Sequence, residues 1–136
     1  MPLEIIPRTA EGIQILDLKG QLTLGPEDLE FRAEFDRLIS AGTVRVALNF
    51  EGLRDLDSTG LSTLIAARAA LRKAGGELAM FAVNGSHLEL LTEAHLEISF
   101  EMFPDQQSTI DSFFPEGESK GFDILEFVES QKKKAT

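Results

Sequence analysis

Short runs of apolar residues mark the expected β-strands of this chain. Two such runs, Leu3–Ile6 and Ile13–Leu18, flank Gly12, and this pattern predicts a turn followed by a strand over the second run. Along residues 44–50, large apolar side chains occupy every second position, which predicts a strand at the centre of a sheet. Two further apolar stretches predict strands at residues 78–83 and 98–100.

The segments between these runs have the spacing of helices. Pro26 suits a first helical turn, and the acidic residues after it favour the positive end of a helix dipole. Apolar side chains then recur at near-helical spacing up to Gly42, namely Leu29, Phe31, Phe35, Leu38 and Ile39. Further helices are predicted at residues 61–71, 87–92 (with Ser86 as the candidate N-cap) and 104–113. This alternation of strands and helices predicts an α/β domain with a largely parallel sheet.

The length and composition indicate one globular domain. The chain has 136 residues, 43% of them hydrophobic, which is enough to bury one core and too few to build two. The absence of cysteine excludes disulfides, thiolate metal sites and thiol nucleophiles. No apolar run approaches the roughly 18 residues of a membrane helix, and Met1–Arg8 lacks the apolar region of a signal peptide. We therefore expect a cytoplasmic protein without membrane insertion.

The net charge narrows the range of partners. Lysine and arginine number 13 against 23 acidic residues, so the formal net charge of -10 argues against nucleic acid or anionic lipid as a partner. Residues 74–119 contain acidic residues and neither lysine nor arginine. Two interpretations of this segment stay open: a solvated acidic surface, or a docking face for a basic partner or for the chain's own lysines at 132–134.

The sequence lacks motifs for catalysis and for cofactor binding. Neither a phosphate-binding loop nor a dinucleotide-binding glycine motif follows a predicted strand. His87 and His95 complete no metal or triad motif, and a lone histidine near an acid is expected at the surface. Asp55 and Asp57 form an acidic pair without a third ligand or a nucleophile. We therefore expect no enzyme activity, no metal and no cofactor.

A phosphorelay receiver is the strongest alternative fold, because it has a similar length and a similar α/β order. That family needs a lysine after its last strand. Residues 74–119 contain no lysine, so this interpretation fails.

The segment from Leu53 to Ser62 joins the predicted central strand to an alanine-rich helix and carries the most informative residues. Either Asp57 or Ser58 would be the N-cap, which leaves the Ser58 hydroxyl beside the free N–H groups of the first helical turn. A hydroxyl there suits a phosphoacceptor, because the helix N-terminus stabilises a phosphate dianion. The residues alone nevertheless favour a simple capping loop.

The same segment resembles a known family. Residues 56–61 are similar to the Asp-Ser-Ser/Thr-Gly-Leu signature of the STAS domain, the fold of bacterial anti-sigma factor antagonists. The resemblance extends in order and spacing to residues 20–25, 46–50, 75–78 and 103–113, and covers roughly residues 3–115. It implies a STAS domain over residues 1–115, with a mostly parallel mixed sheet of four to five strands and about four helices. Residues 116–136 would form a C-terminal extension that packs on the domain or on a subunit copy, or binds a partner.

The resemblance also implies a function. In antagonists of this family the serine after the aspartate, here Ser58, is phosphorylated by the anti-sigma factor, which is an ATP-dependent serine kinase. The unphosphorylated form binds that kinase and frees the sigma factor, and a serine phosphatase resets the cycle. The resemblance assigns the switch loop to Asp57, Thr59 and Gly60 and the partner-binding residues to Thr23, Arg54, Asp55, Leu61 and Ser62.

One departure from the family pattern concerns Thr23, because well-known antagonists often carry aspartate at this position. STAS domains also act without a phosphorylation cycle, as interaction or scaffold modules of signalling and transporter complexes. Such a module is the alternative function. Homodimerisation is compatible with the fold in either case.

Overall fold

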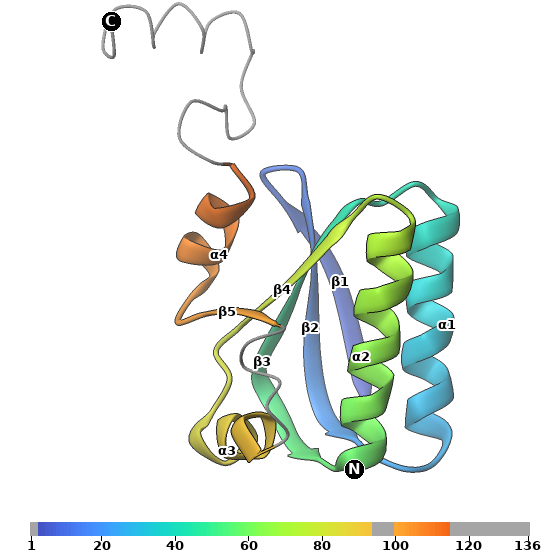
Figure 1. The fold of residues 1–136 in the computed structure, drawn as a ribbon, viewed down its shortest axis with the longest axis vertical. Helices are drawn as coiled ribbons and strands as arrows, with labels where there is room; N and C mark the ends of the chain where they lie inside the picture. The colour runs from blue at the N-terminus through green and yellow to red at the C-terminus, as the bar shows by residue number, and fades with distance from the viewer. Residues whose placement is uncertain (1–2, 94–99, 115–136) are drawn as a thin grey trace, which may run out of the picture.

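The chain folds around one five-stranded mixed sheet (Figure 1). The computed structural model describes residues 3–93 and 100–114, apart from the side chains of residues 26–28. The strands lie in the sheet in their chain order; β1 and β2 are antiparallel, and each later neighbouring pair is parallel. This confirms the predicted mostly parallel sheet with its third strand at the centre. The strands are β1 (Glu4–Ala10), β2 (Ile13–Leu22), β3 (Arg45–Leu56), β4 (Glu77–Phe81) and β5 (Glu101–Phe103).

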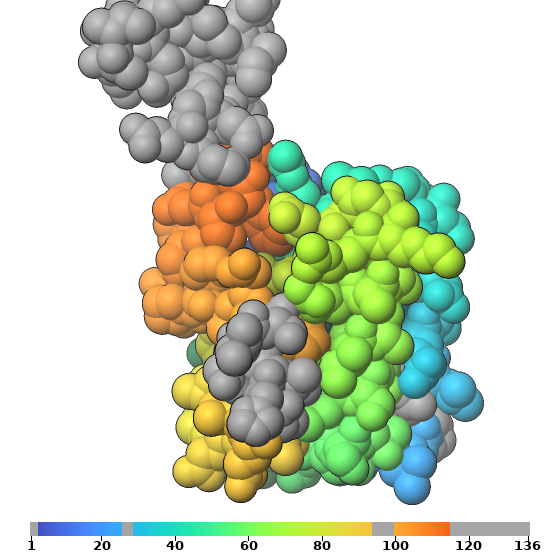
Figure 2. Space-filling view, viewed as in Figure 1, coloured from blue at the N-terminus to red at the C-terminus, as the bar shows by residue number. Residues whose placement is uncertain are grey.

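Helices cover both faces of the sheet. The first two, α1 (Pro26–Ser40) and α2 (Ser58–Lys73), lie side by side on one face, and α2 runs along the surface seen in Figure 2. The short helix α4 (Gln106–Phe113) packs on the other face through Ile110 and Phe113. The remaining helix, α3 (Gly85–Glu93), lies at the end of the molecule where α2 begins (Figure 1). No described helix is both long and apolar enough to cross a membrane.

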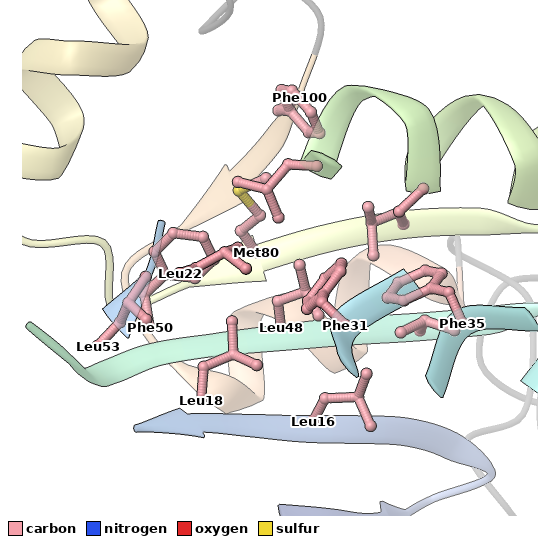
Figure 3. Packing of buried hydrophobic residues seen from close by; sticks show 14 of the residues in the cluster. Leu16, Leu18, Leu22, Phe31, Phe35, Leu48, Phe50, Leu53, Met80 and Phe100 are labelled. Carbon is pink, nitrogen blue, oxygen red and sulfur yellow. The ribbon is translucent and has the colours of Figure 1, made fainter. Parts of the chain in front are cut away.

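The larger core fills the space between the sheet and the first two helices (Figure 3). Phe31 and Phe35 of α1 stack with their ring centroids 5.0 Å apart. From α2, Leu64 and Leu71 are fully buried, so a continuous apolar stripe fixes this helix on the sheet. The strands contribute Leu16, Leu18, Leu22, Val46, Leu48, Phe50, Leu53 and Met80.

The central strand is longer than the sequence predicts. The prediction ends this strand at residue 50 and places a loop after it, whereas β3 continues to Leu56. Its pairing with β2 shifts register twice, between Asp17 and Lys19 and between Gly20 and Gln21. Each shift inserts an extra residue into β3, and such bulges interrupt the alternation of apolar and polar side chains. Residues 51–56 therefore lack the alternating pattern of a strand, although their backbone belongs to β3.

All four predicted helices form, with ends within three residues of the predicted ones, but two details of the helices differ. Leu29 is 68% exposed, because it lies off the buried face that Phe31 and Phe35 share. Asn84 rather than Ser86 caps α3, since its Oδ1 accepts a hydrogen bond of 2.9 Å from the His87 amide. The predicted strand at residues 98–100 falls mostly outside the described residues, and the described strand begins at Glu101. The predicted extension at residues 116–136 lies outside them entirely.

A polar cluster on the face that carries α4 joins four elements. Arg8 Nε donates to Asp17 Oδ2 at 2.7 Å, and Asn49 Nδ2 donates to Asp17 Oδ1 at 2.9 Å. Arg8 also reaches α4, because Nη2 donates to Gln106 Oε1 at 2.7 Å. Partial burial acts to raise the pKa of Asp17, but the hydrogen bonds from Arg8 and Asn49 outweigh this effect and leave the pKa lowered.

This lowered pKa gives a testable pH dependence. Ionised Asp17 stabilises the fold above the ordinary carboxyl pKa of about 4, and this contribution is lost as the pH falls through the lower folded value. Asp17→Asn is expected to reduce the free energy of unfolding by about 1 kcal/mol at pH 7. The difference from wild type should narrow as the pH approaches 3, measured by urea unfolding at several pH values. A difference that stays constant with pH would show that the charge of Asp17 is not involved.

Candidate functional site

Asp57 organises the loop that carries the candidate phosphoacceptor. Its backbone is extended at the N-cap of α2, and Oδ1 accepts a hydrogen bond of 2.8 Å from the Gly60 amide. The second oxygen, Oδ2, accepts a hydrogen bond of 3.1 Å from the Leu24 amide in the segment between β2 and α1. One carboxylate therefore caps α2 and ties it to a neighbouring loop. Of the two N-cap candidates in the sequence, the structure selects Asp57.

Ser58 is the first residue of α2, and its side chain is exposed. The backbone oxygens of Ser58 and Thr59 accept hydrogen bonds of 3.1 Å from the hydroxyls of Ser62 and Thr63, one turn further along the helix. The N-terminus of a helix carries partial positive charge, which favours an added anion. The position is therefore chemically suited to accept a phosphate.

Gly60 fixes how closely α2 approaches the sheet. It is buried, and a Cβ atom at this position would lie 2.2 Å from the backbone oxygen of Leu22 and 2.8 Å from Leu56 Cδ1. Real Cβ atoms do not come so close to other atoms, so every other residue type would push the helix away from the end of β2. The glycine of the signature therefore sets the position of the neighbouring serine.

The other predicted site residues differ in how far they are exposed to solvent. Thr23 is half-buried and directly precedes Leu24, whose amide binds Asp57. Arg54 and Asp55 are exposed near the carboxyl end of β3, and Ser62 is exposed one turn along α2 from Ser58. Leu61 is only 6% exposed, so its side chain packs in the core and is not directly accessible to a partner.

Sequence reasoning missed the exposure of three apolar side chains on α1, on α2 and in the segment before α1. Leu24 is 77% exposed, Leu29 in the first half of α1 is 68% exposed, and Ile65 on α2 is 44% exposed. Leu24 is tied to this loop by the bond from its amide to Asp57, so its exposed side chain is available for a contact beside the loop. Leu29 was detectable in the sequence, because it lies about 200° around a helix from Phe31.

His87 was also misjudged, since the sequence predicts it at the surface. It is 4% exposed in α3, and Nε2 lies 3.2 Å from the carbonyl oxygen of Arg54. Its ring packs edge-on against Phe50 with the centroids 6.3 Å apart. His95, the second histidine, falls outside the described residues. In the described ranges, no group of three or more histidine or acidic side chains has the arrangement to hold a metal ion.

Comparison with solved structures shows what the fold resembles. The phosphorylated Bacillus cell fate determinant SpoIIAA matches with a TM-score of 0.63 and 18% identity, over 82% of this chain and 98% of that one. An anti-sigma factor antagonist from Mycobacterium paratuberculosis matches with a TM-score of 0.71 and 14% identity, over 81% and 92%. A sulfate transporter family protein from Wolinella succinogenes matches with a TM-score of 0.65 and 16% identity, over 87% and 88%. Identities this low establish the fold alone.

Comparison at the level of sequence gives a more decisive result. A search of curated protein sequences returns no match. The family model of the STAS domain, in contrast, matches residues 4–109. That range begins with β1 and ends within α4, so it includes every strand of the sheet and the loop around Ser58. The protein belongs to the STAS domain family.

Proposed function

We propose that this protein is an anti-sigma factor antagonist whose binding to an anti-sigma factor serine kinase is switched by phosphorylation of Ser58. One observation carries the proposal: an exposed serine at a helix N-terminus is held in a fixed place by the Asp57 cap and by the close approach at Gly60. A plain capping loop needs the aspartate, but it needs neither an exposed hydroxyl at this position nor a second bond to Leu24. The protein acts as a binding regulator rather than as an enzyme.

The expected energetics describe a switch at the surface. Phosphate adds about 1.5 to 2 negative charges beside Asp57 and Asp55. The helix N-terminus offsets this repulsion by about 0.3–1 kcal/mol. The fold therefore survives phosphorylation, whereas a misplaced charge in a protein interface costs several kcal/mol. Binding changes while the structure of the domain does not.

The apolar side chains beside the acceptor support a protein partner. Leu24 is held near Ser58 by the bond between its amide and Asp57, and Leu29 on α1 and Ile65 on α2 are also exposed. In the proposal, the unphosphorylated surface binds the kinase through these residues and the nearby Thr23, Arg54, Asp55 and Ser62. A serine phosphatase would return the modified protein to the binding form.

Intact-mass measurement after incubation with ATP and the cognate kinase tests the acceptor. Wild type is expected to gain one phosphate and Ser58→Ala none. Ser62→Ala is the control, because Ser62 carries a second exposed hydroxyl on the same helix, and this variant should still gain one phosphate on Ser58. Phosphate on the Ser58→Ala variant would contradict the assignment.

A second function has a specific observation in its favour. Thr23 stands where antagonists of this family often carry an aspartate, so a carboxylate is missing near the acceptor. The alternative is a phosphorylation-independent STAS interaction module of a signalling or transporter complex. Tight binding to a partner together with no phosphate on Ser58 would favour this module over the switch.

A further inference from the structure

The carboxyl half of β3, which leads into the acceptor loop, has strand pairing on one side among the described residues. Its pairs with β4 end at Asn49 and Phe81, while its pairs with β2 continue to Leu56. Both register shifts of the sheet also fall in this half. A bulged strand with one neighbour is less constrained than a strand inside a regular sheet. A contact from another element would therefore add to the restraint that β2 places on the end of β3.

His87 supplies such a contact. Its Nε2 lies 3.2 Å from the carbonyl oxygen of Arg54, three residues before Asp57. A carbonyl oxygen only accepts hydrogen bonds, so Nε2 carries the proton and donates it. The imidazole is 4% exposed, and water therefore does not replace this donor.

Helix α3 is itself well anchored. Asn84 caps it through the His87 amide, and Leu91 is fully buried in the main core. The imidazole also packs edge-on against Phe50 of β3, with the rings at 74°. The donor is thus held both by its own anchored helix and by a ring contact with an earlier residue of β3.

We propose that His87 is a positioning residue for the acceptor loop: its hydrogen bond to the Arg54 carbonyl fixes the end of β3, and through Asp57 it fixes the place of the Ser58 hydroxyl. The inference rests on the proposed function, because it gives this contact a role in the phosphorylation of Ser58. The Asp57 carboxylate bonds to the amides of Leu24 and Gly60, so movement at the strand end is transmitted to both.

Two variants separate the hydrogen bond from simple packing. His87→Gln keeps an N–H donor at nearly the same distance from Cα but loses the ring, whereas His87→Phe keeps a ring against Phe50 and loses the donor. Positioning by the hydrogen bond therefore predicts that the glutamine variant resembles wild type and that the phenylalanine variant fails. Positioning by ring packing predicts the reverse order.

Two readouts are measured on both variants. The first is kcat and KM for phosphorylation of Ser58 by the cognate kinase. For His87→Phe we expect kcat/KM to fall about 10- to 100-fold, the size of effect that a small misplacement of a reacting group produces. The second readout is amide hydrogen exchange, which needs no kinase. Exchange at Leu24 and Gly60 should rise about tenfold in His87→Phe, while exchange at Phe35, in the core of α1, should stay unchanged.

The outcomes distinguish failure of the inference from failure of the proposed function. Equal phosphorylation of both variants and wild type would overturn the positioning role and leave the switch intact. Faster exchange at Phe35 as well would also overturn it, because general loss of stability would then explain the result. Faster exchange confined to Leu24 and Gly60 in His87→Phe, together with no phosphate on any form, would support positioning and overturn the switch.

Discussion

Ser58→Asp is expected to weaken binding to the cognate anti-sigma kinase by about 30-fold or more, because a permanent negative charge in the interface costs about 2 kcal/mol or more. Ser58→Ala removes a hydroxyl and adds no charge, so it should bind within about threefold of wild type. Isothermal titration of the kinase with each variant measures both affinities.

The control for this experiment places the same charge elsewhere. Ser112→Asp adds a carboxylate to α4, on the opposite face of the sheet from α2, and should bind like wild type. Urea unfolding of all three variants checks that the fold is retained, as expected because Ser58 and Ser112 are both exposed. Equal affinity of the Ser58→Ala and Ser58→Asp variants would contradict a switch that acts through charge.

Gly60→Ala is expected to lower the free energy of unfolding by about 2–3 kcal/mol, the cost of forcing extra atoms into a packed site. The added Cβ would lie 2.2 Å from the Leu22 backbone oxygen, and backbone cannot yield as a flexible side chain can. The better helix propensity of alanine offsets only about 1 kcal/mol. Thermal or urea unfolding measures the net effect.

Gly85 provides the matched control for this substitution. Gly85 also lies in the first turn of a helix, as the first residue of α3, but a Cβ there meets no atom within 4 Å among the described residues. Gly85→Ala should therefore leave the stability unchanged or raise it slightly. If Gly60→Ala were as stable as Gly85→Ala, the close approach between α2 and the end of β2 would not be what positions the acceptor.

The sequence predicted those features that depend on local pattern. The stripe of Phe31, Phe35 and Leu38 predicted α1 and its buried face, and all three residues are buried. The alternation along residues 44–50 predicted the central strand. The polar residues before the alanine-rich helix narrowed its N-cap to Asp57 or Ser58, because a capping interaction spans only three residues, and the structure shows that Asp57 is the cap. In each case the residues that decide the structure are neighbours in the chain.

The features that sequence reasoning missed depend on distant parts of the chain. The bond between Asp57 and Leu24 joins residues 33 positions apart, and so does the contact between His87 and the Arg54 carbonyl. The extension of β3 to Leu56 depends on its pairing with β2, which the bulges hide from any simple period. No local pattern signals such contacts, so the place of His87 in the core became visible only in the folded chain.

The most direct measurement of the switch compares one protein in two states. Wild type phosphorylated to completion and the same sample after treatment with a serine phosphatase are titrated separately with the cognate kinase. We expect the phosphorylated form to bind at least about 30-fold more weakly, and the phosphatase to restore the original affinity. The same affinity for both states would contradict the proposal that phosphorylation of Ser58 controls binding.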